Sequence, residues 1–289
     1  MEIPTTVQSV HHWCEPDSHL ESWAESEPEP QQRDPVVDDA KEELKKFFAE
    51  NPDKAFYQRQ LQIIFEGPFF HWITARALAE LAEEGFIACD KLPFGDKGSI
   101  AIYRAKSHRY WKRQANEIVE LVSRFSTESF THALGAHGEQ MVDAALPTAG
   151  FLPKGKNVRS YKGNQWTETG HDLDRIFERD GVGWGTEIKN TLGYIGRYEL
   201  QVKVQMCRQL GLRPLFIVRM APKSYINEVA VAGGFTLVLK YQLYPFGQKA
   251  FADTVRRTLQ LPTDCPDRIA DGTVQRFLKG HLKILGKSA

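Results

Sequence analysis

The sequence has few cysteines and no long apolar stretch. No run of residues approaches the roughly 18 consecutive apolar positions that would indicate a membrane-spanning helix. Residues 1–10 contain no basic region followed by an apolar stretch, so we expect no secretory signal and no membrane partner. The four cysteines, at positions 14, 89, 207 and 265, form no CxxC pair, which disfavours a disulfide framework or a cysteine-rich zinc site. These absences predict a cytoplasmic protein with reduced thiols.

Two nucleotide-binding signatures are also missing. The sequence contains no GxxxxGK followed by Ser or Thr, and no GxGxxG after an expected strand. We therefore expect no nucleotide cofactor. What is present is an ordinary composition, with 42% hydrophobic and 26% charged residues, in a 289-residue chain that is long enough for two modest domains.

The formal net charge of zero conceals an uneven distribution of charge. Residues 1–40 contain ten acidic residues and one arginine, whereas the whole chain has 37 residues of each sign. By difference, residues 41–289 contain 36 basic and 27 acidic residues, a balance of +9. A basic body behind an acidic segment favours a polyanionic partner, of which nucleic acid is the simplest.

Residues 1–36 are rich in Glu, Pro, Ser and Gln. Such a composition buries too little apolar surface to offset the entropy of ordering, so we predict a disordered tail. A first domain is expected over residues 37–106, and Asp38 or Asp39 is expected to cap its first helix. Its apolar periodicity predicts three helices and then two strands, over residues 38–50, 56–65, 70–84, 86–89 and 99–104.

Three helices followed by a hairpin resemble a winged helix-turn-helix module, and the phrase ALAELAEEGFI before the hairpin is typical of one. In such modules the third helix enters the major groove of DNA. The resemblance makes His71, Thr74 and Arg76 the candidate contacts on the helix, with Lys97 on the wing. Because the end of the helix is acidic and many winged helices bind protein, protein binding is the alternative for this domain.

A basic segment, YRAKSHRYWKR, occupies residues 103–113 and contains no acid. Basic side chains interleaved with aromatic ones can hold phosphates and stack on bases. We therefore name Arg109, Lys112 and Arg113 as candidate nucleic-acid contacts. The alternative is a solvated linker helix over residues 107–125. The two interpretations are compatible, because a basic helix can lie along DNA.

The stretch GHDLDRIFERDGVGWGTEIKN, residues 170–190, is the centre of a second domain expected over residues 126–289. Its pattern predicts a hairpin with strands over residues 171–177 and 184–190. Side chains alternate between the two faces of a strand. Asp172 and Asp174 therefore share one face, and folding the hairpin brings them to Glu187 and Lys189.

Two acids near one lysine suit metal-assisted hydrolysis of a phosphodiester. Mg²⁺ prefers hard oxygen ligands and is usually held by one or two carboxylates together with phosphate oxygens. Asp174 and Glu187 are the expected carboxylate ligands, and the carbonyl of Ile188 is a third oxygen; Mn²⁺ is expected to substitute for Mg²⁺. Lys189 is expected to orient the attacking water or to offset the charge that develops on the phosphoryl group.

The order of elements around this hairpin, α-β-β-β-α-β, resembles the PD-(D/E)xK nuclease superfamily over residues 126–244. Asp174, in DLD, matches the acid on that family's second strand, and Glu187 and Lys189, in TEIKN, match the ExK of its third strand. Glu139, in GEQMVDAAL, resembles the acid on its first helix. The resemblance implies an α/β fold, with a restriction-endonuclease-like core of a mixed central sheet flanked by helices, behind a small winged-helix domain.

One branch of this family adds a glutamine from the following helix, in a QxxxY pattern. Gln201 stands at the position of the glutamine, and Gln205 stands where the tyrosine would be. The resemblance therefore makes Gln201 a candidate catalytic residue. Arg197, which precedes it, is a candidate phosphate contact.

Two residues beside the acids leave alternatives open. Asp172 is either a second metal ligand or the principal ligand in place of Asp174, although the family pattern aligns with Asp174. His171 is either an acid–base group or a histidine at the end of a strand.

The sequence thus predicts a metal-dependent deoxyribonuclease, an endonuclease that acts on DNA in a restriction, mobile-element or defence context. A homodimer is compatible with it, because cutting both strands takes two sites. Three alternatives remain open. One is a DNA-binding regulator that no longer cuts, one is a nuclease subunit active only in a multiprotein complex, and one is a nuclease that acts on RNA.

Overall fold

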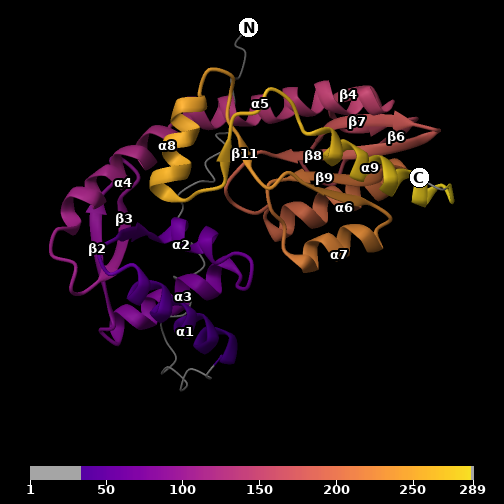
Figure 1. Cartoon of the computed structure of the whole chain (residues 1–289). Coiled ribbons are helices and arrows are strands. Elements are labelled where there is room, and N and C mark those ends of the chain that lie inside the picture. The colour runs from indigo at the N-terminus through magenta and orange to yellow at the C-terminus, as the bar shows by residue number, and fades with distance from the viewer. Residues whose placement is uncertain (1–33, 288–289) are drawn as a thin grey trace, which may run out of the picture. The chain divides into compact units, whose positions relative to one another are not determined.

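The computed structural model describes residues 34–287, so the acidic segment up to residue 33 lies outside the described residues (Figure 1). The described chain forms two compact units. One contains the residues up to Gln58 together with His71–Ala115, and the other contains Arg59–Phe70 together with the residues from Asn116 onward. The division differs from the expected domains, because α4 (Trp111–Phe125), which covers most of the expected linker, is shared between the units. No helix within residues 34–287 is long and apolar enough to cross a membrane.

The first unit combines helices with a three-stranded antiparallel sheet in the order β1-β3-β2. Its elements, with α2 placed among them in chain order, are α1 (Pro35–Glu50), β1 (Ala55–Tyr57), α2 (Gln58–Ile64), α3 (His71–Glu83), β2 (Ile87–Pro93) and β3 (Ser99–Ala105). Most of α2 belongs to the second unit. There, Glu66 forms a paired contact with the buried Arg219, with both nitrogen–oxygen distances at 2.6 Å.

The first helix starts earlier than the sequence pattern predicts. Asp34 caps it by accepting a hydrogen bond from the Val36 N–H at 3.0 Å, and Pro35 occupies the first helical position. Proline suits this position because its missing N–H would have no partner there. Asp38 and Asp39 therefore lie inside the helix, and the prediction that one of them caps it is wrong.

A short strand replaces the first part of a predicted helix. The sequence predicts helix over residues 56–65, but β1 pairs with β3, and Tyr57 lies opposite Ile102. The ring of Phe56 is buried, with its centroid 4.9 Å from that of Phe47. A three-residue strand is stabilised by a partner some 45 residues away in the chain, so its local pattern carries little signal.

The second unit is built on a five-stranded sheet in the order β10-β9-β8-β7-β4. Strand β7 pairs antiparallel with both β4 and β8, whereas β8, β9 and β10 run parallel to one another. Its main elements are α5 (Glu128–Ala145), β4 (Leu152–Val158), β7 (Leu173–Arg179), β8 (Val182–Lys189), α6 (Arg197–Leu210), β9 (Arg213–Val218), α7 (Lys223–Val231), β10 (Phe235–Val238), α8 (Lys249–Leu259) and α9 (Asp271–Ile284). The predicted α/β class, with a mixed central sheet flanked by helices, is confirmed.

Helices cover both faces of this sheet (Figure 1). On one face, Trp184 packs in a buried cluster with Met141 of α5 and Phe277 of α9. On the other face, the strand residue Ile176 packs against Met206 of α6. Side chains of the central strands are therefore directed either toward α5 and α9 or toward α6 and α7.

The hairpin β7–β8 is closed by a two-residue turn. Asp180 and Gly181 both have positive φ, 50° and 76°, between the paired residues Arg179 and Val182. Positive φ at both central positions produces the twist that joins two strands most tightly, and Asp-Gly is a preferred pair for it. The strands are consequently displaced by about two residues from their predicted bounds, residues 171–177 and 184–190.

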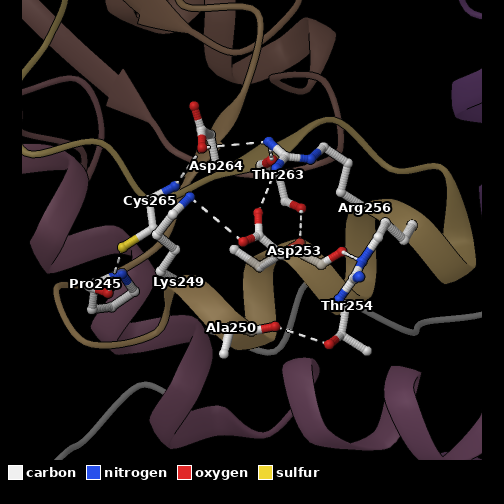
Figure 2. Close-up of polar contacts among 11 residues, drawn as sticks. Pro245, Lys249, Ala250, Asp253, Thr254, Arg256, Thr263, Asp264 and Cys265 are labelled. Atoms are coloured by element: carbon white, nitrogen blue, oxygen red, sulfur yellow. Dashed lines mark hydrogen bonds and ion pairs between the residues drawn. The ribbon is translucent and has the colours of Figure 1, made fainter.

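The C-terminal part adds α8 and a two-stranded parallel pair, β11 (Gln242–Leu243) and β12 (Thr263–Asp264). Figure 2 shows the polar contacts that fasten α8 to β12. Arg256 binds Asp253 on its own helix and lies 3.4 Å from the carboxylate of Asp264. The Thr263 hydroxyl donates to a carbonyl of α8 at 2.9 Å.

Candidate active site

Asp174 and Glu187 lie on adjacent strands of the β7–β8 hairpin. The register pairs Arg175 with Thr186, so the next pair along the ladder brings the two acids side by side. Glu187 is 2% exposed. The Asp174 carboxylate accepts a hydrogen bond from the Ile188 N–H at 2.7 Å, which holds it against β8. The hairpin thus brings two carboxylates together on the face that α6 covers.

Two lysines flank the buried Glu187. Lys189 Nζ lies 3.1 Å from one Glu187 oxygen and 2.8 Å from the carboxylate of Glu199 on α6. Lys203 Nζ lies 2.5 Å from the other Glu187 oxygen and also binds the carbonyl of Asp172. The site therefore contains three carboxylates and two ammonium groups, with Glu187 between both cations.

Sequence reasoning missed Lys203 and Glu199. They are separated by one helical turn on α6, so both face the same side. A signal was available: Lys203 is on the apolar stripe that includes Leu200, Met206 and Leu210, and it is 4% exposed. A lysine on a buried helical face requires a partner, and Glu187 is that partner.

The ionised form of Asp174 is disfavoured in this site. Burial and the neighbouring Glu187 raise the pKa of Asp174 to about 7, although Lys203, the Ile188 N–H and Lys189 act in the opposite direction. Burial lowers the pKa of Lys189, but the charges of Glu187 and Glu199 outweigh it, so the net pKa lies above its ordinary value. Lys189 therefore stays protonated, whereas ionising Asp174 costs free energy in the folded protein.

The pKa of Glu199 also depends on its neighbours. Burial acts to raise it, but the charges of Lys189 and Lys203 and the hydrogen bond from Lys189 bring it below its ordinary value. Glu199 is thus a stable carboxylate.

The donor set suits Mg²⁺. This cation is usually held by one or two carboxylates, with water and phosphate oxygens completing the coordination. Burial, and then the charge of Glu187, raise the pKa of Asp174, so its ionised form is costly and a bound cation would offset that cost. Within residues 34–287, no group of three or more His, Cys, Asp or Glu side chains is arranged to hold a metal. Asp174 and Glu187 are the two carboxylates that this site would offer to such a cation.

The structure distinguishes Asp174 from Asp172. Asp172 precedes β7, and its carbonyl is bound by Lys203, whereas Asp174 lies within the strand beside Glu187. The side chain of Ile188 packs in the cluster with Trp184, so only its main chain is available to the carboxylate pair. The geometry thus favours Asp174 as the partner of Glu187.

The structure does not bring Glu139 to this pair. Its carboxylate lies 2.9 Å from the buried guanidinium of Arg175 and 3.6 Å from Lys156. Arg175 also binds Asp143, and both of these acids belong to α5. Because successive strand residues face opposite sides, Arg175 is directed to α5 while Asp174 is directed to α6. Glu139 thus pairs with Arg175, whose guanidinium also donates to the Asp174 carbonyl at 2.7 Å, and its catalytic role stays a prediction.

The structure does not bring Gln201 to the site either. It is exposed, and it lies two positions from both Glu199 and Lys203 on α6. Two positions turn a helix by about 200°, so Gln201 occupies the opposite side. Gln205 is also away from the site and donates to the carboxylate of Glu168 at 2.8 Å. The inner position that the resemblance assigned to a glutamine is filled by Lys203.

The candidate nucleic-acid contacts on α3 and in the β2–β3 loop differ in their exposure to solvent. Thr74 is 0% exposed, so the prediction that it contacts DNA is wrong, because α3 turns this residue inward with Ile73 and Ala77. Arg76 is partly exposed and pairs with Glu80 at 2.8 Å. His71 is half-buried, and Lys97 is exposed in the β2–β3 loop.

The three candidate contacts of the basic segment lie on the surface. Arg109, Lys112 and Arg113 are all exposed, at and just before the start of α4. Arg197 is less available, because its guanidinium lies 2.5 Å from the carboxylate of Glu228 and 5.4 Å from the centre of the Tyr225 ring. A phosphate would have to compete with Glu228 for Arg197.

The chain matches no family model, no curated protein and no solved structure. The functional interpretation therefore depends on the residues of the site and their geometry.

Proposed function

We propose that this protein is a metal-dependent deoxyribonuclease of the PD-(D/E)xK type. The observation that carries the proposal is the juxtaposition of Asp174, Glu187 and Lys189 on one hairpin, where Glu187 is buried and Asp174 is half-buried. Carboxylate pairs of this kind serve metal-assisted hydrolysis of phosphodiesters. By analogy with such nucleases, we propose an endonuclease with a role in restriction, mobile DNA or defence in the cytoplasm.

In this proposal Asp174 and Glu187 hold Mg²⁺, with the Ile188 carbonyl as a further oxygen. The metal, when bound, supplies positive charge that activates water and polarises the scissile phosphate. Lys189 stays protonated because of Glu187 and Glu199, so it acts as a cation that orients the attacking water and offsets charge on the phosphoryl group. Lys203 holds Glu187 in place from α6.

The first unit is proposed to position the enzyme on DNA as a winged helix. Its helices α1 and α3 and its three-stranded antiparallel sheet, whose last two strands form a hairpin after α3, support this proposal. Arg109, Lys112 and Arg113, together with Lys97 in the β2–β3 loop, offer exposed cations to the phosphates.

The test is cleavage of supercoiled plasmid in Mg²⁺ or Mn²⁺ by the wild type and by Lys189→Ala. We expect metal-dependent nicking that falls by at least about a hundredfold in the variant, the scale on which losing one charge-stabilising group slows a reaction. Lys249→Ala is the matched control, because Lys249 is a mostly exposed lysine of the same unit that pairs with Asp253 at 3.5 Å. It should cut like the wild type.

Other outcomes redirect the proposal. No nicking by folded wild-type protein that still binds DNA would contradict it, and would favour a non-cleaving regulator or a subunit that requires a partner. Faster cleavage of matched RNA than of DNA would assign the same site to RNA. Equal loss in Lys189→Ala and Lys249→Ala would show that the activity does not reside at the hairpin.

A further inference from the structure

The loop that leads into β7 is held by long side chains from elsewhere in the second unit. Arg159 donates from Nε to the His171 carbonyl at 3.1 Å and also binds the carbonyl of Thr169. Lys203 binds the carbonyl of Asp172, the next residue. Three carbonyls within four residues are therefore fixed by cationic donors, which gives the loop a single conformation and presents the His171 side chain from it.

The imidazole of His171 is also held in one tautomer. The Thr169 hydroxyl oxygen accepts hydrogen bonds from Trp166 Nε1 at 3.1 Å and from the His171 main-chain N–H at 3.3 Å. Both of its lone pairs are thereby used. At its 2.8 Å contact with His171 Nδ1, the hydroxyl must donate, so Nδ1 accepts. The proton of the neutral ring then resides on Nε2.

The ring of His171 is half-buried, and its hydrogen bond is made at Nδ1. Its Nε2–H group has no hydrogen-bond partner within residues 34–287. Tyr198, 64% exposed at the start of α6, lies edge-on to the His171 ring with the ring centroids 6.0 Å apart. Tyr198 immediately precedes Glu199, the partner of Lys189, on α6, and Lys203 joins the Asp172 carbonyl, next to His171, to Glu187. A fixed donor without a partner therefore lies beside the carboxylate–lysine cluster.

We propose that His171 is a substrate-binding residue that donates its Nε2–H to a phosphate oxygen of the nucleic acid held at the Asp174–Glu187 pair. Thr169 and Trp166 act as positioning residues that keep the proton on Nε2. Tyr198 shields one side of the ring and offers its own exposed ring to the neighbouring sugar or base. This inference rests on the proposed nuclease function and names a substrate contact that the ExK pattern does not include.

The test measures DNA affinity in Ca²⁺, in place of cleavage, with a fluorescent duplex and the full chain. His171→Phe keeps a flat ring and removes the donor, whereas His171→Gln retains an N–H close to the place of Nε2. Thr169→Val removes the hydroxyl that sets the tautomer, and Thr169→Ser retains it. His132→Phe is the control, because His132 is an exposed histidine of α5.

We expect His171→Phe and Thr169→Val to weaken binding about tenfold, the scale of one hydrogen bond to a charged group. His171→Gln, Thr169→Ser and His132→Phe should bind within about twofold of the wild type. At a pH where NMR shows a single proton on the ring, the slope of log affinity against log salt should not change in His171→Phe, because a neutral donor releases no counterion. Nitrogen-15 NMR of the labelled ring should show the proton on Nε2 in the wild type.

Unchanged affinity in His171→Phe, with wild-type cleavage of plasmid, overturns the inference and leaves the nuclease standing. A ring proton on Nδ1 overturns the tautomer argument independently of any activity. Wild-type protein that neither binds nor cuts DNA overturns both proposals, because the substrate named here would be absent.

Discussion

The buried Glu187 is the residue on which the site depends. It has a lysine on either side, one from its own strand and one from α6. Removing one partner of a buried ion pair costs about 3–5 kcal/mol, because the other charge is left without compensation. Lys203 is 5% exposed at its side chain and Lys189 is 31% exposed, so substitution of Lys203 perturbs folding more. Lys189 is therefore the better probe of chemistry.

Asp174 should be a destabilising residue in the metal-free protein. Its pKa is raised from 3.8 to about 7, so the folded state resists ionisation and stability falls as pH rises from about 4 to about 7. Each pKa unit corresponds to about 1.4 kcal/mol, which sets a ceiling of about 4 kcal/mol. We expect Asp174→Asn to unfold at a higher temperature than the wild type at pH 8 in EDTA, while losing metal-dependent cleavage.

The advantage of Asp174→Asn should shrink as the pH is lowered from 7 toward 4, where the wild-type carboxyl takes up its proton. Thermal unfolding across this pH range, with Asp253→Asn as the control for an acid outside the site, gives the comparison. A wild-type protein more stable than Asp174→Asn at pH 8 without metal would contradict the raised pKa.

At the scale of elements, the close approach of α6 to β8 places Lys203 and Glu199 over the hairpin. Gly185 permits this approach, because a Cβ there would lie 2.5 Å from the Cys207 sulfur and 2.8 Å from a methyl group of Leu173. The helix can therefore lie against the strand only where the strand has no side chain.

We expect Gly185→Ala to lower the free energy of unfolding by about 1–3 kcal/mol, the usual cost of overpacking a core. Adding Cys207→Ala should recover part of this loss, since it removes the sulfur that the new methyl group meets. Urea denaturation of both single variants and the double variant measures this coupling. Gly170→Ala is the control, because nothing lies within 4 Å of a Cβ there. Strictly additive losses would mean that the methyl group added at Gly185 does not meet the Cys207 sulfur.

At the scale of the whole molecule, charge is divided along the chain. Residues 41–289 contain nine more basic than acidic residues, and the exposed basic segment is part of that excess. Its effect on DNA binding should be long-range and dependent on salt.

The triple variant Arg109→Ala, Lys112→Ala, Arg113→Ala should reduce the slope of log affinity against log salt by up to about 2.7, because each lost phosphate contact is worth about 0.9. Fluorescence anisotropy with duplex DNA between low and moderate salt measures it. A triple variant of exposed cations elsewhere, at Lys249, Arg257 and Lys279, should retain the wild-type slope. An equal reduction in both triple variants would assign DNA binding to net charge and not to this segment.

The parts of the fold that short-range patterns predict are those whose partners are close in the chain. The hairpin that joins Asp174 to Glu187 is one, because strand alternation and an Asp-Gly turn are local properties. The mixed sheet flanked by helices follows from the succession of apolar strands and amphipathic helices, and it is confirmed. The nuclease activity stays a prediction.

Contacts between elements far apart in the chain could not be predicted from local patterns. The pattern of α6 does not show how the helix is rotated over the sheet, and that rotation, set by packing on β8, puts Lys203 inside and Gln201 outside. Likewise, the direction of Arg175 toward α5 removes Glu139 from the acid pair. Local chemistry thus determines which groups the hairpin carries, whereas long-range packing selects the groups that face them, because burial is a property of all elements together.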